Sequence, residues 1–452
     1  MNTIEAYIAR HAACHPDRPA MVCGSEHCTY SALQARIGAF TAHYSTLQRR
    51  SGAGTVVPLR ASSTIDFLAA YFALHRLGLV AAPLERAMPD EAYMRVSAAL
   101  TAHRCPQGTA DVLYTTGTTG RPKGVMVSHR AILADAENLI AGQGFAGDLN
   151  FVVCGPLNHI GSLSKVYPIM MLGATLIIVD GLKDLNAFFS AFSTANTTAR
   201  AGAASLSARF ATFLVPASIR ILLQLAPDRL AALSDCLDFI ETGAAAMTQA
   251  DMDALCRLLP GTRLYNTYAS TETGIICTHD FNSREPRPGC LGRPMPHSGV
   301  FITTSGHIAC TGDTLMTGYL GEPERTAQVL RDGVLYTSDL GTIDADGCLH
   351  LRGREDDVIN VGGFKVAPTE VENAAMSHPS VADCLCTAVD HQITGKALKL
   401  LVVVAQGATL DKRSLAQHLK KRLEAFKVPL LYESVESIKR TFNGKPDRKA
   451  YR

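Results

Sequence analysis

The sequence predicts an α/β protein made of a large N-terminal domain and a smaller α+β domain at the C-terminus. Over most of the chain, short apolar runs alternate with longer helix-like stretches, as in layered α/β architectures. Residues 289–350 then form short runs separated by Gly and Asp turns, which predicts a small β-barrel or sheet. Beyond residue 356 the pattern changes again, over about a hundred residues, the usual size of a folding unit. We therefore expect domains at 1–355 and 356–452.

The individual elements follow from length and periodicity. Short apolar runs rich in branched residues favour strands, and longer stretches with apolar residues every three or four positions favour helices. In the N-terminal domain the expected strands are 55–59, 151–154, 174–179 and 237–241, and the expected helices are 64–77, 128–142 and 249–259. In the C-terminal domain we expect helices at 368–377 and 411–426 and strands at 381–389 and 399–404.

Composition excludes several classes of protein. With 43 Lys plus Arg against 41 Asp plus Glu, the net charge of +2 gives no basic surface for nucleic acid. We expect the first residues to form an amphipathic helix carrying charges rather than a signal peptide. The apolar run 166–179 is interrupted by Pro168 and Gly173 and is too short to span a membrane.

The cysteines point to the cytoplasm. Thirteen cysteines without Cys-x-x-Cys spacing predict reduced thiols rather than disulfides or zinc. Cys384 and Cys386 would lie on one face of a strand, where a buried pair is favoured over a metal site because no second ligand pair follows.

The most informative segment is the loop 114–124, which holds three glycines, four threonines and two cations. Its glycines allow close approach of the backbone, so N–H groups and threonine hydroxyls can converge on phosphate oxygens, and Lys123 adds a charge. Flanking strand-like residues predict a strand-to-strand turn, and the spacing is not that of a P-loop. An ordinary flexible loop is the alternative. The cradle would comprise Thr115, Thr116, Gly117, Thr118, Thr119, Gly120 and Lys123.

Further motifs occur in order along the chain, at 265–272, 336–340, 353–357 and 443–445. Together with the loop they resemble the signatures of the acyl-adenylate-forming enzymes, which include acyl-CoA synthetases, adenylation domains and luciferases. The resemblance covers most of the chain and implies ATP and Mg²⁺ as cofactors, and a mobile C-terminal domain. The region between 85 and 113 is shorter than in that family, which implies that one or two β-α units are missing.

The resemblance also implies roles for individual residues. Glu272, next to Thr271, would hold Mg²⁺, and Lys445 would be the mobile catalytic cation. Asp339 and Arg354 would bind the ribose. The adenine side would comprise Gly243, Ala244, Ala245, Asn266, Thr267 and Tyr268. Turn residues, a structural ion pair and solvated cations remain the alternatives for these groups.

Other implied roles concern domain motion and substrate choice. Asp356 would be the hinge, Gly362 and Gly363 would leave room for a pantetheine arm, and His159 would gate the thiol tunnel; turn glycines and a structural histidine are the alternatives. The acyl pocket would comprise Ile160, Gly202, Ala203, Ala204, Gly243 and Ala269.

These residues are small and neutral, and Asn158 stands near where amino-acid-activating relatives have an Asp, so a nonamino carboxylic acid is favoured. We expect a carboxylic acid:CoA ligase. An acid:carrier-protein ligase and a noncatalytic nucleotide-binding regulator are the alternatives, and an oligomer is possible.

Overall fold

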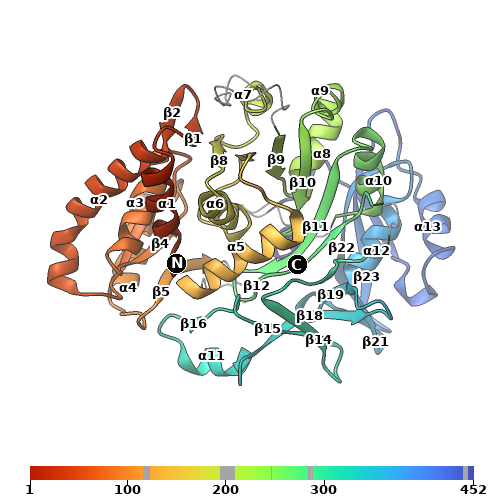
Figure 1. Ribbon diagram of the computed structural model, residues 1–452. Helices are drawn as coiled ribbons and strands as arrows, with labels where there is room; N and C mark the ends of the chain where they lie inside the picture. The colour runs from red at the N-terminus through yellow and green to blue at the C-terminus, as the bar shows by residue number, and fades with distance from the viewer. Residues whose placement is uncertain are drawn as a thin grey trace.

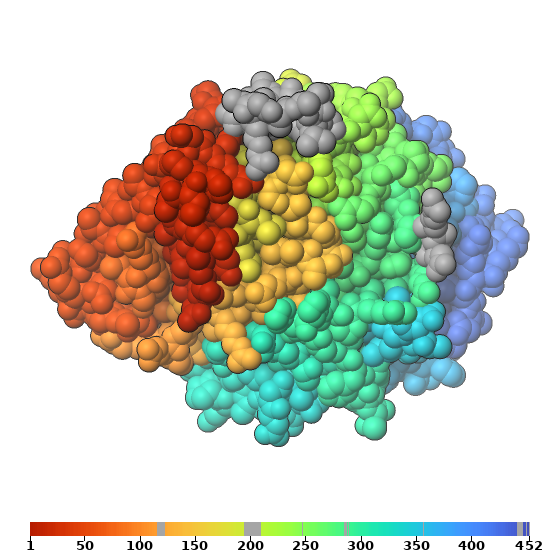
Figure 2. All heavy atoms as spheres, in the orientation of Figure 1, coloured from red at the N-terminus to blue at the C-terminus, as the bar shows by residue number. Residues whose placement is uncertain are grey.

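The computed structural model describes residues 1–115, 123–193, 209–245, 247–283, 287, 289–440 and 446–451, without the side chains of Thr115, Asp356 and Lys449. The N-terminal elements lie at one end of the molecule and the C-terminal ones at the other (Figures 1 and 2). The expected α/β layering is confirmed. None of the described helices combines the length and apolar character needed to cross a membrane.

A nine-stranded sheet occupies the middle of the N-terminal domain, in the order β13-β12-β11-β10-β9-β7-β8-β1-β2. Neighbours from β11 to β1 are parallel. The strands are β1 (Pro19–Cys23), β2 (Glu26–Thr29), β7 (Leu149–Val153), β8 (Thr175–Ile178), β9 (Arg209–Phe213), β10 (Leu237–Thr242), β11 (Arg263–Ser270), β12 (Gly274–Asp280) and β13 (Arg293–Pro294).

Helices cover both faces of this sheet. Successive residues along its strands point to opposite faces, and the residues on both faces are apolar. Phe151 and Phe239 pack towards one face, and Val152 and Ile240 pack towards the other. The first face carries α1 (Ile4–Cys14), α5 (His129–Gln143) and α6 (Ile160–Leu172). The second carries α7 (Leu185–Ser190), α8 (Pro216–Leu225), α9 (Pro227–Ala231) and α10 (Gln249–Leu258).

A second sheet has the order β16-β6-β5-β4-β3. Its strands are β3 (Val56–Arg60), β4 (Val80–Leu84), β5 (Thr109–Thr115), β6 (Lys123–Ser128) and β16 (Gly318–Tyr319). The helices α3 (Ile65–Arg76) and α4 (Asp90–Thr101) pack on this sheet, and α2 (Tyr30–Ser51) packs on α3 and α1 and beside β1 and β2. β5 and β6 are antiparallel, and their pairing runs from Thr109 with Ser128 to Thr115 with Lys123. The glycine-threonine segment therefore connects two strands, as predicted.

Residues 298–354 form an antiparallel sheet, the second of the two forms expected there. Its order is β14-β15-β18-β17, with β19 beside β18. The elements are β14 (Ser298–Ile302), β15 (His307–Gly312), α11 (Pro323–Val329), β17 (Leu330–Arg331), β18 (Val334–Ile343) and β19 (Leu349–Arg354).

The C-terminal part has its own apolar core. It contains β20 (Ile359–Val361), β21 (Phe364–Val366), α12 (Pro368–Met376), β22 (Val381–His391), β23 (Gly395–Val404), α13 (Lys412–Lys420) and β24 (Leu431–Ser434). Cys384 and Cys386 are buried as free thiols on β22, as expected. The helix expected at 411–426 extends six residues too far. α13 ends at Lys420, and Leu423 and Phe426, which follow it, pack on this core.

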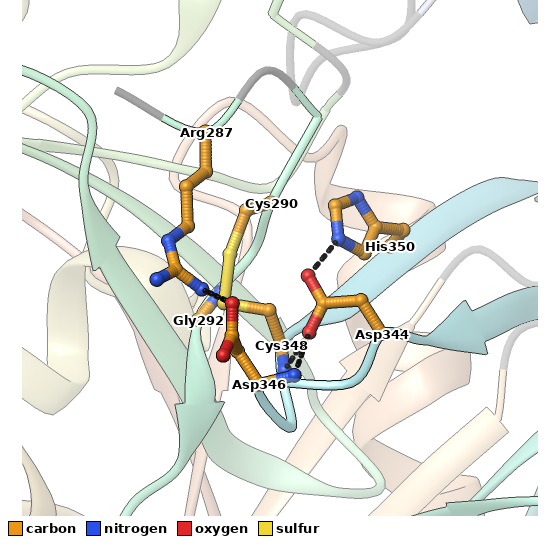
Figure 3. The surroundings of a disulfide bond; sticks show 7 residues. All are labelled: Arg287, Cys290, Gly292, Asp344, Asp346, Cys348 and His350. Carbon is orange, nitrogen blue, oxygen red and sulfur yellow. Dashed lines mark hydrogen bonds and ion pairs between the residues drawn. A yellow bond between two sulfur atoms is a disulfide. The ribbon is translucent and has the colours of Figure 1, made fainter. Parts of the chain in front are cut away.

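One prediction about the cysteines is wrong. Cys290 and Cys348 form a disulfide, and eleven cysteines are free. The bridged residues are 58 positions apart, but the strand arrangement brings their Cα atoms to 6.0 Å, within the range of a disulfide. Asp344 accepts hydrogen bonds from the Cys348 amide and from His350 beside the bridge (Figure 3).

Candidate active site

The candidate site lies along the carboxyl edge of the nine-stranded sheet. β7, β9, β10 and β11 run parallel, so the residues that follow them meet at one edge. His159 comes after β7, Gly243 after β10, and Thr271 and Glu272 after β11. Open α/β sheets bind ligands at this edge.

Two motifs far apart in the sequence meet at Asp339. The hydroxyl of Tyr268 donates to Asp339 Oδ2 at 2.8 Å, and Arg354 Nη1 lies 3.5 Å from Oδ1. Asp339 and Arg354 are paired residues of β18 and β19. Burial, followed by the Asp339 charge, raises the pKa of Tyr268, so this phenol stays a proton donor. The ion pair considered as the alternative role of Arg354 is present, and Asp339 retains the acceptor capacity that a ribose needs.

A second cluster gathers around Tyr319. Its hydroxyl donates to Glu272 Oε1 at 3.1 Å, and Lys123 Nζ lies 5.0 Å from the centre of its ring. Burial lowers the pKa of Lys123, and the charge of Arg325 adds to the effect. The end of the glycine-threonine segment therefore lies near Glu272. Sequence reasoning missed Tyr319, whose only signal is an aromatic residue between turns.

Close packing and buried hydrogen bonds fix the turn that carries Glu272. Gly274 has φ +67°, and a Cβ there would lie 2.7 Å from both Asp135 Oδ1 and the Thr314 backbone, so only glycine fits. Asp135 accepts a hydrogen bond from the Ile275 amide at 2.8 Å, and burial raises its pKa to about 7. Thr273 and Ser270 bond to each other across the turn.

Gly243 and Ala244 line the end of β10. A Cβ on Gly243 would lie 3.0 Å from the Thr267 carbonyl oxygen, so the backbones approach closely. Ala244, which stands where the resembling family has glycine, has φ +65° and is exposed. This conformation costs an L-residue about 1–2 kcal/mol.

The structure separates the other predicted residues of the adenine side. Asn266 is buried on β11, next to Tyr268. Thr267 is turned inwards, where its hydroxyl accepts from Gln143 at 3.1 Å and contacts Thr278 at 3.0 Å. Its hydroxyl is therefore bonded within the core, and a place for Thr267 on the adenine side stays a prediction.

Several predicted residues lie outside the described part of the chain. These are Thr116, Gly117, Thr118, Thr119, Gly120, Gly202, Ala203, Ala204 and Lys445. Only the backbone of Thr115 and Asp356 is described; Thr115 pairs with Lys123, and Asp356 lies in a 3₁₀ turn over Glu355–Asp357. His159 and Ile160 begin α6, and Ala269 lies on β11, all partly buried.

A buried ion pair close to the sheet edge was not predicted. Lys165 Nζ on α6 lies 2.7 Å from Glu241 Oε1 on β10, and each side chain is 1% exposed. A lysine and a glutamate within otherwise apolar runs were the available signal, because buried charges are nearly always paired. Their pairing depends on the sheet order and could not be deduced.

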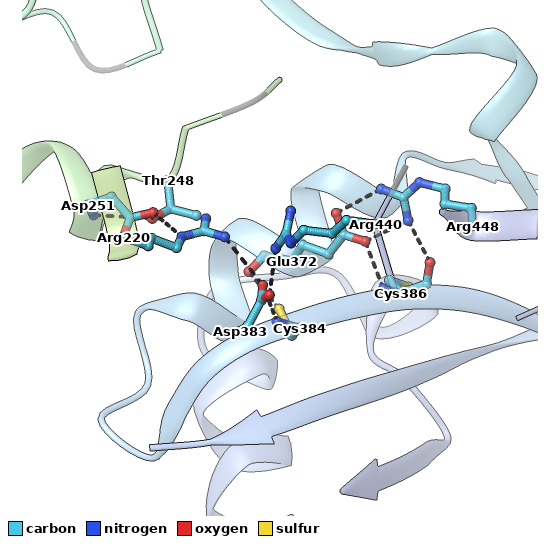
Figure 4. Close-up of polar contacts among 9 residues, drawn as sticks. All are labelled: Arg220, Thr248, Asp251, Glu372, Asp383, Cys384, Cys386, Arg440 and Arg448. Carbon is cyan, nitrogen blue, oxygen red and sulfur yellow. Dashed lines mark hydrogen bonds and ion pairs between the residues drawn. The ribbon is translucent and has the colours of Figure 1, made fainter. Parts of the chain in front are cut away.

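In the C-terminal domain Gly362 and Gly363 form the exposed β20–β21 turn, as expected of a glycine loop. Just after the undescribed segment 441–445, Arg448 binds both oxygens of Glu372 on α12, at 2.7 and 2.9 Å (Figure 4). Arg448 Nε lies 3.7 Å from Asp357, the neighbour of Asp356. These contacts anchor the chain on the far side of Lys445 to the residues next to the predicted hinge.

Comparison with known proteins defines the class. The family model "AMP-binding enzyme" matches residues 8–103 and 95–320, and "AMP-binding enzyme C-terminal domain" matches 370–445. The chain belongs to the AMP-binding enzyme family.

Individual relatives agree with that assignment. The chain is 31% identical over 354 residues to a feruloyl-CoA synthase of Amycolatopsis sp, covering 75% of this chain and 69% of that protein. It is 29% identical to a long-chain-fatty-acid–CoA ligase of Bacillus subtilis, covering 74% of this chain and 59% of that protein. Its fold resembles ATP-bound MatB from Rhodopseudomonas palustris, with a TM-score of 0.85 and 22% identity over 99% of both chains.

Proposed function

We propose that this protein is an ATP-dependent carboxylic acid:CoA ligase that works through an acyl-AMP intermediate. Family membership and the CoA ligases among its relatives support the reaction class. The observation that carries the proposal is the hydrogen bond from Tyr268 to Asp339, because it unites two motifs 71 residues apart at one edge of the sheet.

The two clusters suit opposite ends of ATP. Asp339 would accept hydrogen bonds from the ribose hydroxyls, with Tyr268 and Arg354 fixing its orientation. Lys123 and the preceding loop would neutralise the phosphates. Glu272 offers the carboxylate oxygen that Mg²⁺ prefers, and the ion would there offset the charge of the pyrophosphate.

In the first half-reaction a carboxylate oxygen of the acid attacks the α-phosphorus of ATP, and the bond to pyrophosphate breaks. The charge being rearranged is negative throughout, so positioning and cations supply the catalysis. In the second, the CoA sulfur attacks the acyl carbon, loses its proton, and AMP leaves. We propose that Lys445 acts in the first half-reaction only, and that rotation at Asp356 replaces it by the Gly362–Gly363 turn.

Acid-dependent exchange of pyrophosphate into ATP, measured with a panel of carboxylic acids and Mg²⁺, tests the first half-reaction. We expect exchange with some acids and none without acid. Failure with every acid would favour the noncatalytic regulator. Supplying CoA or a pantetheinylated carrier protein then identifies the acceptor, with CoA expected.

The two-step mechanism has its own test. Lys445→Ala should abolish adenylation and largely spare thioester formation from supplied acyl-AMP. Equal loss of both rates would contradict the proposal that the Gly362–Gly363 turn replaces Lys445 between the two half-reactions. We expect the protein in the cytoplasm, where ATP and CoA are supplied.

A further inference from the structure

The buried pair Lys165–Glu241 has no part in the mechanism described so far. Both side chains are 1% exposed and 2.7 Å apart. Burying two ions costs several kcal/mol per ion, and their attraction offsets this only when the remaining polar atoms are also bonded. Here they are not.

One carboxylate oxygen of this pair lacks a hydrogen-bond partner. Among the described residues, Glu241 Oε2 is buried without a hydrogen bond. Lys165 Nζ has three N–H groups, and among the described residues it donates to Glu241 Oε1. Buried polar groups nearly always have a partner, so such atoms need an explanation. A ligand that completes them is one.

Phe213 connects the pair to the candidate site. Lys165 Nζ lies 5.2 Å from the centre of the Phe213 ring, and Phe213 is the β9 neighbour of Glu241. A Cβ on Gly161 would lie 3.0 Å from this ring, and one on Gly243 would lie 3.8 Å from it. The Phe213 ring is therefore a common neighbour of the ion pair, of Gly161 at the start of α6 and of Gly243 at the sheet edge, where the acyl group is expected.

The unused hydrogen-bond donors and acceptors of the pair define the chemistry of the missing partner. The pair is neutral in sum, and it presents ammonium donors beside a carboxylate acceptor. A second carboxylate on the substrate would be repelled by Glu241, and an ammonium would be repelled by Lys165. A hydroxyl both accepts and donates, so it satisfies both sides.

We propose that the acid activated by this protein carries a hydroxyl group at the end remote from its carboxylate. The hydroxyl oxygen accepts a hydrogen bond from Lys165 Nζ, and its proton is donated to Glu241 Oε2. This inference rests on the proposed ligase function, and it names the class of acid for the same site.

Matched acids test it in the pyrophosphate-exchange reaction: para-hydroxybenzoate against benzoate, para-hydroxycinnamate against cinnamate, and omega-hydroxyalkanoates against alkanoates of equal length. We expect the hydroxylated member of at least one pair to have a kcat/KM at least ~10-fold higher, because unpaired polar groups penalise the analogue without the hydroxyl.

The matched variant is Lys165→Met combined with Glu241→Leu. It removes both charges together, since losing one would leave an unpaired buried ion. The double variant should keep its melting temperature within a few degrees and lose the preference for the hydroxylated acid. If the double variant fails to fold, the kcat/KM values of the wild-type protein for the matched acids still decide whether a hydroxylated acid is preferred.

The outcomes separate this inference from the proposed function. Exchange with acids but no preference for a hydroxyl, or preference for a dicarboxylate or an amino acid, would overturn the inference alone. A preference that persists in the folded double variant would overturn the role of the pair. Absence of exchange with every acid would overturn the ligase function and the inference together.

Discussion

Asp339 is the residue on which the nucleotide site depends most. It receives the Tyr268 hydroxyl, pairs with Arg354 and has a side chain that is 15% exposed. In Asp339→Asn the acceptor would lose its charge. Because a hydrogen bond to a charged group contributes about 1.5–3 kcal/mol, we expect the KM for ATP to rise about 10- to 100-fold. Steady-state kinetics at saturating acid measure this.

The control for that change is Asp346→Asn, an exposed carboxylate paired with Arg287. It should leave the KM for ATP unchanged. Similar values for both variants would remove Asp339 from the nucleotide site.

Ala244 is a second residue whose effect can be measured. Its φ of +65° disfavours any side chain, so Ala244→Gly should raise the free energy of unfolding by up to ~1 kcal/mol. Ala245→Gly, at a neighbour without positive φ, should not raise it. Urea denaturation compares the two, and an equal loss of stability in both variants would show that the backbone conformation is unstrained.

At the scale of elements, a buried network joins α1, α3 and β5. His75 contacts Glu5 at 3.0 Å and Asp111 at 2.9 Å, so both ring nitrogens are engaged. Tyr71 also donates to Asp111. Glu5, His75 and His129 have the spacing of a metal site within the described residues, but His75 already has two carboxylate partners, which makes an ion-pair network the better description.

This network predicts a dependence of stability on pH. The two carboxylates raise the pKa of His75 to about 10, despite burial. Since that folded-state pKa exceeds the unfolded value of 6.5, the stabilisation is complete below pH 6.5 and is lost as the pH rises towards 10. Between those values the free energy of unfolding should fall by about 1.4 kcal/mol per pH unit from this group.

Chemical denaturation at pH 7, 8 and 9 measures the slope. His75→Gln should be less stable throughout and should lack this component, whereas exposed His27→Gln should keep it. An identical slope in His75→Gln would mean that the imidazole is neutral in the folded protein.

The same elements show what sequence could predict. The strand–loop–strand context of residues 114–124 and the adjacency of Tyr268 and Glu272 are local, so pattern and motif sufficed. The pairs Lys165–Glu241, Cys290–Cys348 and Lys123–Tyr319 depend on which strands become neighbours, which no local pattern specifies. The φ of Ala244 and the inward turn of Thr267 likewise follow from tertiary packing.

At the scale of the whole molecule, Asp383 joins the two domains. Arg220 of α8 lies 3.4 Å from Asp383 of β22, which also pairs with Arg440 at 2.5 Å (Figure 4). If the C-terminal domain rotates between half-reactions, the contact with Arg220 exists in one orientation only, whereas the contact with Arg440 stays within the domain.

Arg220→Gln should therefore change the two half-reactions unequally, by about two- to fivefold, the scale of a single partly exposed ion pair. Arg440→Gln is the matched control and should change them equally or not at all. Single-turnover adenylation and thioester formation from acyl-AMP give the two rates. Equal changes in Arg220→Gln would mean that this contact does not distinguish the orientations.

The Cys290–Cys348 bridge affects how the molecule behaves after backbone cleavage. It encloses residues 291–347, including the exposed turn at Asp332 and Gly333. A protease that nicks this turn leaves two fragments still tethered through sulfur. The nicked protein would migrate as one band in a non-reducing gel and as two after dithiothreitol, so the strand bearing Asp339 would remain attached to the body of the protein despite the nick.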